Sequence, residues 1–191
     1  NKQIKKNDLQ KYYKVIIACY DQNNLILKNL GFKPKKKYKY ELVEKIIIKL
    51  PKNYKKESFM VLDGKFVCLD PYLGTKYHLL SSNKHSKIET KISYFPIFKD
   101  KRKKYINKGI IKDRSISLFN KFIIHGSKYL EFLNQSKYIG SYYVVRALEI
   151  NKEKTDERLN KINFIDDKIV TIFSGKWNTS ITVAKKIINM I

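Results

Sequence analysis

An excess of positive charge constrains this chain more than any other feature of its sequence. Lysine and arginine number 41 against 17 aspartates and glutamates, which gives a formal net charge of +24 on 191 residues. Charges of one sign repel each other and oppose compaction, so an acidic partner is expected. The apolar fraction of 43% is close to the globular average and predicts a real hydrophobic core. Nucleic acid is the commonest polyanion that such a chain meets.

The positive charge is concentrated in the first part of the chain. Residues 1–112 contain 28 basic and 9 acidic residues, whereas residues 113–191 contain 13 and 8. We therefore expect a strongly basic α+β region followed by a less basic α+β region, packed together as one domain. No apolar run approaches the roughly 18 residues that a membrane span needs, so we expect no membrane partner.

Hydrophobic periodicity predicts an α+β fold: a small, mostly antiparallel sheet with flanking helices and extended basic loops. Helices are expected over residues 8–30, over 115–135, and from Thr179 or Ser180 to the end, although the polar stretch 21–24 could divide the first into a helix and a strand. Strands are expected over 44–50, 75–80, 87–95 and 141–150, the last pairing with 167–173, although 141–150 could instead form a helix. The final helix should bury Ile181, Ala184, Ile187, Ile188 and Ile191, with Trp177 packed against it.

A hairpin is predicted over residues 58–69. Asp63 and Gly64 stand there between two apolar runs, and a type I′ turn needs residues that accept positive φ. The hairpin falls within the strongly basic region.

Three lysine-rich segments are the predicted RNA-binding sites. Lysines meet phosphates as point charges, and neighbouring tyrosines can stack on unpaired bases. The chain has 4 arginines against 37 lysines. Arginine is the residue that most often recognises a specific base, so this composition favours contacts with the phosphate backbone over recognition of a base sequence. A solvated face enriched in lysine by AT-rich codons is the alternative. The predicted residues are Lys33, Lys35, Lys36, Lys37, Lys39 and Tyr38; Lys52, Lys55 and Lys56, with Lys49 and Tyr54 nearby; and Lys99, Lys101, Arg102, Lys103 and Lys104.

An enzymatic alternative rests on three residues. Asp70, followed about twenty residues later by Glu89 and Lys91, resembles the PD-(D/E)xK nuclease pattern. The resemblance implies that Asp70 and Glu89 hold a divalent metal and that Lys91 assists catalysis. An ordinary turn role for Asp70 and local ion pairing of Glu89 explain the same residues without chemistry.

Cysteine and histidine offer no further site. The two cysteines and three histidines have no metal-ligand spacing, and no phosphate-binding or nucleophile motif occurs. We therefore expect no catalytic residue, metal, cofactor or small-molecule substrate.

In its basic loops, small α+β core and lack of a catalytic constellation, the chain resembles ribosomal proteins as a class. The resemblance implies a structural constituent of a ribosome that binds rRNA and neighbouring ribosomal proteins; no individual family is identified. An excess of residues with AT-rich codons (Lys, Ile, Asn, Tyr and Phe) indicates an AT-rich coding sequence. This skew and the start at Asn1 favour a processed protein of a divergent organellar ribosome, most simply mitochondrial. A plastid-type organelle, a cytosolic ribosome of an AT-rich organism, and a DNA-packaging or viral protein are the alternatives.

Overall fold

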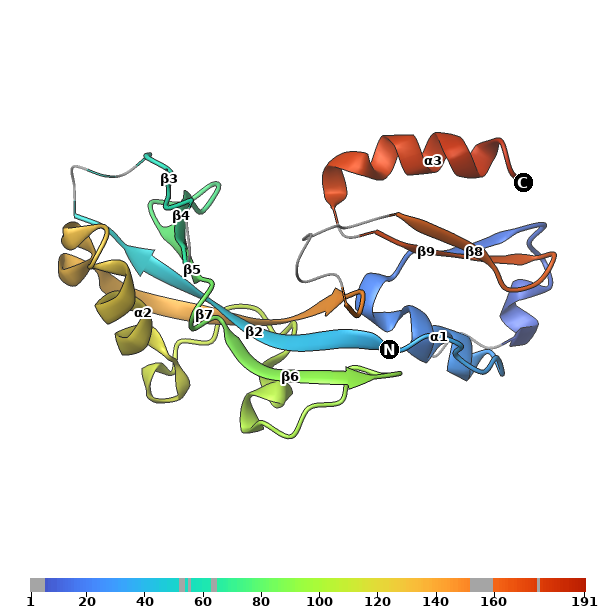
Figure 1. Cartoon of the computed structure of the whole chain (residues 1–191), viewed down its shortest axis with the longest axis horizontal. Helices are drawn as coiled ribbons and strands as arrows, with labels where there is room; N and C mark the ends of the chain where they lie inside the picture. Colours follow the sequence, from blue (N-terminus) through green and yellow to red (C-terminus); the bar gives the residue numbers. More distant parts are fainter. Residues whose placement is uncertain (1–5, 52–53, 55, 63–64, 152–159, 175) are drawn as a thin grey trace. The chain divides into compact units, whose positions relative to one another are not determined.

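The computed structural model describes the whole chain except residues 1–5, 52–53, 55, 63–64, 152–159 and 175. The described residues combine α-helices with mainly antiparallel sheets, which confirms the α+β prediction (Figure 1). They form two compact units: unit 1 comprises residues 1–40, 91–97 and 146–191, and unit 2 comprises 41–90 and 98–145. This division does not coincide with the charge boundary at residue 112, because the chain enters each unit more than once. No helix of the described part is long and apolar enough to cross a membrane.

Unit 1 contains a three-stranded sheet with a helix on either side in Figure 1. Its elements, with η for 3₁₀-helices, are η1 (Lys6–Leu9), β1 (Val15–Ile17), η2 (Tyr20–Gln22), α1 (Asn23–Asn29), β8 (Lys161–Phe164), β9 (Ile169–Phe173), η7 (Trp177–Thr179) and α3 (Ser180–Ile188). The strand order is β1–β9–β8, with β1 parallel and β8 antiparallel to β9. On one face of this sheet, Ile17 and Ile169 pack with Leu27 and Leu30 in a buried cluster.

The single helix predicted over residues 8–30 is wrong. A short strand, β1, precedes the helix α1, and Tyr20 (φ 52°) turns the chain between them. The buried Asn23 side chain holds this turn, since its Oδ1 accepts from Cys19 N at 2.8 Å and its Nδ2 donates to Ile172 O at 2.6 Å. The apolar spacing could not reveal the strand, because its pairing partner lies near the other end of the chain.

Unit 2 is built on a larger sheet. Its elements are β2 (Tyr38–Lys49), β3 (Phe59–Met60), β4 (Val67–Pro71), β5 (His78–Ser82), β6 (Lys87–Ser93), η4 (Lys101–Tyr105), η5 (Arg114–Ile116), α2 (Phe119–Gly126), η6 (Glu131–Gln135) and β7 (Lys137–Leu148), and the ends of β2, β6 and β7 belong to unit 1. The strand order is β3–β4–β5–β2–β6, and β7 also pairs with β2. The core includes Ile46, Leu69 and Leu80 from the strands and Phe122 from α2. Strands predicted over 44–50, 75–80, 87–95 and 141–150 are present.

The predicted hairpin is confirmed with a shifted register. β3 and β4 pair antiparallel with Phe59 opposite Leu69 and Met60 opposite Cys68. A two-residue turn at positions 63–64 would place Phe59 opposite Cys68 instead, so the pairing differs by one residue. The turn residues Asp63 and Gly64 lie outside the described residues.

Two predictions in the second half of the chain need correction. The helix expected over 115–135 is divided into α2 and η6, because α2 ends at Gly126. A Cβ at Gly126 would lie 2.7 Å from Leu133 Cδ1, so glycine is what lets η6 pack this closely. The pairing of residues 141–150 with 167–173 is also wrong: β7 pairs with β2, whereas β9 pairs with β1 and β8.

The C-terminal helix is confirmed as α3, but its buried face differs from the prediction. Val183 and Ile187 are buried, whereas Ile181 and Ile188 are each 70% exposed. Trp177 is 89% exposed and so does not pack against the helix as predicted. The helical spacing predicted an amphipathic helix, but it could not show which face of that helix is buried.

Candidate nucleic-acid interface

A basic turn, defined as residues 99–104, follows β6 in unit 2. The Glu89 carboxylate on β6 accepts hydrogen bonds from the backbone N–H groups of Lys99, at 2.9 Å, and Asp100, at 2.8 Å. Asp100 in turn caps η4, because its Oδ1 accepts from Arg102 N at 2.8 Å. Both carboxylates are therefore used to fix the backbone of the turn.

Arg102 clamps this turn instead of facing solvent. Its Nε and Nη2 each donate to one oxygen of Asp100 at 2.9 Å, and its Nη1 donates to Ile116 O at 3.4 Å. The hydrogen bonds from Arg102 hold the pKa of the Asp100 carboxyl below its usual value. The Arg102 side chain is only 15% exposed, so the prediction of a free phosphate ligand does not fit it. It ties the turn to η5.

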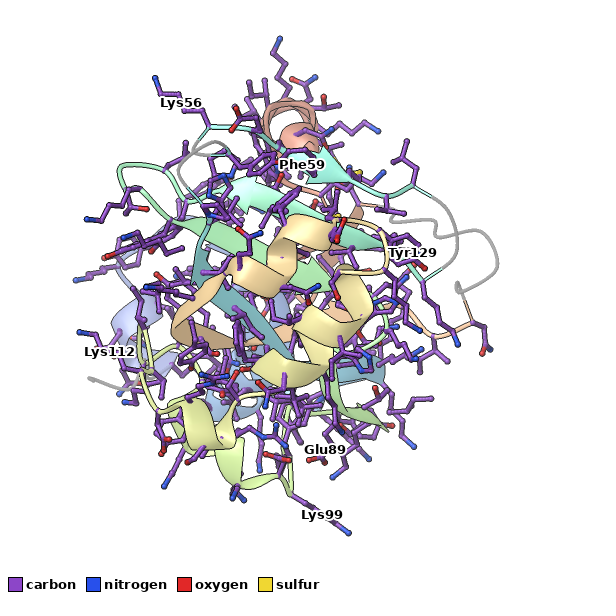
Figure 2. All side chains as sticks on the ribbon, turned by 90° about the vertical axis from the view of Figure 1, so that its left-hand side faces the viewer. Lys56, Phe59, Glu89, Lys99, Lys112 and Tyr129 are labelled. Carbon is purple, nitrogen blue, oxygen red and sulfur yellow. The ribbon has the colours of Figure 1, made fainter. Side chains whose placement is uncertain are left out.

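Four lysines of the turn remain exposed: Lys99, Lys101, Lys103 and Lys104. Figure 2 shows Lys99 projecting away from the ribbon, and Lys112, farther along the same segment, does so as well. Residues 98–114 contain eight basic and two acidic residues. The two acidic residues cap η4 and η5, since Asp113 accepts from Ser115 N at 2.9 Å. The turn therefore presents positive charge that its own acids do not cover.

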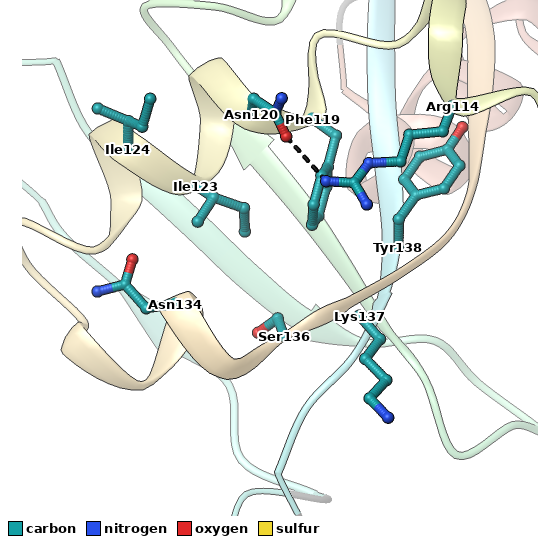
Figure 3. A pocket seen from close by; sticks show the side chains of 9 residues that line it. All are labelled: Arg114, Phe119, Asn120, Ile123, Ile124, Asn134, Ser136, Lys137 and Tyr138. Carbon is teal, nitrogen blue, oxygen red and sulfur yellow. Dashed lines mark hydrogen bonds between the residues drawn. The ribbon is translucent and has the colours of Figure 1, made fainter.

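A groove of about 520 Å³ adjoins η5 and α2, and we call it the α2 groove (Figure 3). Arg114 enters it from η5, with its guanidinium 4.8 Å from the Phe119 ring centroid and Nη2 donating to Asn120 Oδ1 at 3.0 Å. The Ser136 hydroxyl on its wall is buried without a hydrogen-bonding partner among the described residues. The complete lining is Arg114, Phe119, Asn120, Ile123, Ile124, Asn134, Ser136, Lys137 and Tyr138. Cationic, amide and aromatic groups thus share one open surface.

Glu44 on β2 anchors the start of α2. Its side chain is fully buried and accepts from Ser117 Oγ and Ser141 Oγ at 2.6 Å each, from Leu118 N at 3.0 Å and from Tyr143 OH at 3.3 Å. Burial and the charge of Glu44 raise the pKa of Tyr143, which keeps that hydroxyl a donor. One carboxylate therefore joins β2, β7 and the N-terminus of α2, and so supports one wall of the groove.

The segment 33–39 in unit 1 keeps most of its lysines exposed, but some of them have partners within the protein. Lys33, Lys35, Lys36 and Lys37 are exposed, but Lys36 forms an ion pair with Glu149. The ammonium of Lys37 lies 5.4 Å from the Tyr94 ring centroid. Lys39 is half-buried and also has an interaction within the protein.

The tyrosines of this segment are not available for base stacking. Tyr38 is 7% exposed and stacks on Phe173 with ring centroids 4.4 Å apart, and Tyr40 is 1% exposed. Burial and the nearby Glu149 raise the pKa of Tyr38. Tyr38 and Tyr40 are two residues apart on β2, so both point to the same side of the strand, and both are buried in the core.

The segment around residues 49–56 is only partly described. Lys49 and Lys56 are exposed, whereas Lys52 and Lys55 lie outside the described residues. Tyr54 stacks on Phe132 with centroids 4.1 Å apart, so it is packed rather than open. Lys56 and Lys99 lie toward opposite ends of Figure 2, so these two predicted clusters do not form one continuous patch.

The three residues of the nuclease hypothesis are not brought together as a metal site. Asp70 on β4 accepts from Ser58 Oγ at 2.6 Å, and Glu89 on β6 binds the basic turn. β5 and β2 lie between those strands, which separates them by about 14 Å at the usual strand spacing. Both carboxylates would have to come within about 2.6 Å of one ion. Across the described residues, no group of three or more histidine, cysteine, aspartate or glutamate side chains could hold a metal.

Sequence reasoning missed Arg114, Lys137 and Glu44. Lys137 has no basic neighbour in the sequence, and Arg114 lies beyond the cluster 99–104, so a search for dense lysine clusters passes over both. Glu44 carries one signal that could have been read: in a strand, residues 44, 46 and 48 point to the same face, so Glu44 is expected on the side of Ile46 and Ile48. Its partners come from η5, α2 and β7, which only the fold assembles.

No protein-family model matches the sequence, and the comparison with curated proteins gives no match. One solved structure similar to this chain is that of an L-amino acid deaminase from Proteus vulgaris from which the specific insertion sequence was deleted. The sequences are 12% identical and the TM-score is 0.48; the match covers 86% of this chain and 34% of the deaminase. The chain thus spans about a third of that protein's length, and a similarity at this level does not bear on its function.

Proposed function

We propose that this protein binds RNA through the basic turn and the α2 groove of unit 2. The observation that carries the proposal is how the acidic residues are used there. Glu89, Asp100 and Asp113 accept hydrogen bonds from backbone N–H groups, while the four lysines of the turn stay exposed. The result is a fixed backbone that carries unneutralised ammonium groups, which suits binding to phosphates.

The groove supports single-stranded RNA as the preferred form. Arg114 and Lys137 offer cations, and Asn120 and Asn134 offer amides that can pair with the edge of an unstacked base. Unpaired bases can enter such a groove, whereas bases within an RNA duplex are hidden. Arg102 links the turn to η5, so phosphate and base contacts would come from one supported surface.

In its more specific form, the proposal is that the RNA is ribosomal and that the protein is a non-catalytic constituent of a mitochondrial ribosome. The sequence composition supports this form: net charge +24 and many lysines but few arginines. Retention on ribosomal particles through a salt gradient would test the assignment to a ribosome. Sedimentation apart from the particles at low salt would contradict it while leaving RNA binding to be measured separately.

The test of RNA binding compares two variants with equal loss of charge. The turn variant replaces Lys99, Lys101, Lys103 and Lys104 by Gln, and the control replaces the exposed Lys65, Lys76, Lys84 and Lys128 of the same unit. Affinity for a single-stranded RNA oligonucleotide is measured by fluorescence anisotropy over a range of salt concentrations.

The turn variant should bind about 250-fold more weakly near physiological salt, because four lost phosphate contacts each remove roughly 0.7 from the salt slope. The control should lose much less. Equal losses in both variants would show a general charge effect and reject the turn as the site. A salt slope near zero for the unmodified protein would reject phosphate binding altogether.

A further inference from the structure

α3 carries a second apolar face that nothing in the described structure covers. Val183 and Ile187 are the buried residues of the helix. Another set of apolar side chains is exposed, with Trp177 at 89% and Ile181 and Ile188 at 70% each. We call this set the α3 stripe: Trp177, Ile181, Ala184, Ile188 and Ile191. Large apolar residues exposed singly are ordinary, but an aligned row of them marks an interaction surface.

The spacing of the stripe fits a partner helix. Its residues follow one another at intervals of four, three, four and three, which is the alternation of the two seam positions in a heptad repeat. Within α3, Ile181, Ala184 and Ile188 fall in an arc of about 60°. A seam this narrow is typical of helix–helix packing, whereas a helix lying on a membrane presents a wider apolar face. The small Ala184 at its centre permits close approach.

The sheet of unit 1 is also incompletely covered on one face. Residues in register on neighbouring strands point to the same face, so Ile16, Val170 and Phe164 share one face. That face is opposite to the one on which Ile17 and Ile169 pack with α1. Val170 is fully buried there, yet Ile16 and Phe164 on the edge strands are 46% and 45% exposed. Unit 1 therefore covers its α1 face well and the other face in part.

The charge beside the stripe selects the chemistry of the partner. Residues 176–191 contain Lys176, Lys185 and Lys186 and no carboxylate. A second copy of this chain would bring the same lysines and a further net charge of +24, which repels. We propose that the α3 stripe docks an amphipathic helix of a protein partner whose seam is flanked by Asp or Glu.

The chain supplies its own reporter for this interaction. Trp177 is its only tryptophan and stands at one end of the stripe. Three synthetic peptides of about three heptads serve as probes: one with Ile and Leu at the seam and Glu beside it, one of identical composition in scrambled order, and one with Lys in place of Glu. The full-length chain is titrated with each while tryptophan emission and acrylamide quenching are recorded.

The Glu-flanked heptad peptide should shift the emission to shorter wavelength and protect Trp177, and the other two should not. In Ile181→Asn/Ile188→Asn its affinity should fall at least about tenfold, because two apolar contacts are lost. Leu73→Asn, at a 90% exposed position of unit 2, is the matched control and should bind unchanged. Both variants replace exposed side chains, and circular dichroism checks that they fold.

Four results would overturn the proposal. The scrambled peptide could bind equally well, which would reveal mere charge attraction. Vesicles containing phosphatidylserine could shift the emission when the peptide does not, which would make the occupant a membrane. Protection of Trp177 could rise with protein concentration alone as a dimer sediments, which would make the occupant a second copy. Finally, the folded chain could show no response to the Glu-flanked peptide. None of these depends on RNA binding.

Discussion

Two buried glutamates, Glu149 in unit 1 and Glu44 in unit 2, are stabilised in opposite ways. In unit 1, Glu149 is 6% exposed and lies within ion-pair distance of two lysines, Lys36 and Lys161. In unit 2, the fully buried Glu44 is satisfied by three hydroxyl groups and one backbone N–H. Neutral donors can solvate a buried carboxylate without consuming a cation.

This difference separates two kinds of lysine that look alike in the sequence. Lys36 stands in the basic segment 33–39, but its charge is used inside the protein. Lys101 stands in the basic turn, where neighbouring acids bind backbone N–H groups and Arg102 instead. The basic turn therefore leaves its lysines for an external anion, whereas Lys36 of unit 1 stabilises the protein itself. Elsewhere in unit 2, Lys87 likewise lies 3.9 Å from the buried Glu41.

The largest loss of stability is expected from removing Glu44, the carboxylate that is hydrogen-bonded only to neutral donors. Glu44→Ala leaves several buried donors without an acceptor and should lower the free energy of unfolding by about 3 kcal/mol or more. Glu149→Ala should cost only about 1 kcal/mol, because Lys36 and Lys161 are 47% and 40% exposed and can turn to water. Urea unfolding of both variants at neutral pH measures the difference. Similar losses would remove the distinction between the two glutamates.

The contribution of Glu149 to stability is expected to depend on pH. Burial alone would raise the pKa of Glu149, but Lys36 and Lys161 outweigh it and hold that pKa below its usual value. A carboxyl with a lowered pKa in the folded state adds stability above its unfolded pKa, and this stability disappears as pH falls through the folded pKa. Lys36→Met should therefore be about 1 kcal/mol less stable than the unmodified protein near neutral pH, with the gap closing below about pH 4. A gap that stays constant down to acidic pH would show that packing, not charge, explains it.

The elements that could be predicted from the sequence are those formed by interactions between residues close together in the chain. The β3–β4 hairpin, β7 and α3 were predictable, since each depends on neighbouring residues. The division into β1 and α1 was not, because Val15–Ile17 pair with residues 169–171. For the same reason, the lysine clusters could not show that Arg102 is clamped or that Tyr38 is buried. Those outcomes depend on Asp100, Ile116 and Phe173, whose positions only the fold supplies.

A third prediction tests whether the geometry of the basic turn matters as much as its charge. Asp100→Ala removes a negative charge, so charge alone predicts tighter binding to RNA. Loss of the cap and of the Arg102 clamp should cost the ordered turn about 1 kcal/mol, which reduces the binding-competent fraction roughly fivefold. We therefore expect weaker binding in fluorescence anisotropy. Asp167→Ala, with the same charge change at an exposed position of unit 1, is the control and should bind equally or slightly better. Tighter binding by Asp100→Ala would show that the clamp is irrelevant.

The smallest expected effect is the difference in RNA affinity between two single variants, one at Lys101 of the basic turn and one at Lys36 of the segment 33–39. Removing one phosphate contact with single-stranded RNA changes the salt slope by roughly 0.7, which near physiological salt corresponds to about a fourfold loss of affinity. Lys101→Gln should show that loss and the smaller slope. Lys36→Gln should change affinity less than about twofold, since the Lys36 ammonium is already paired with Glu149 and contributes little to the field outside. Both variants lose one positive charge, so the net charge cannot explain a difference between them. Equal losses would mean that RNA responds to total charge alone, and the contrast between the two basic segments would then have no functional consequence.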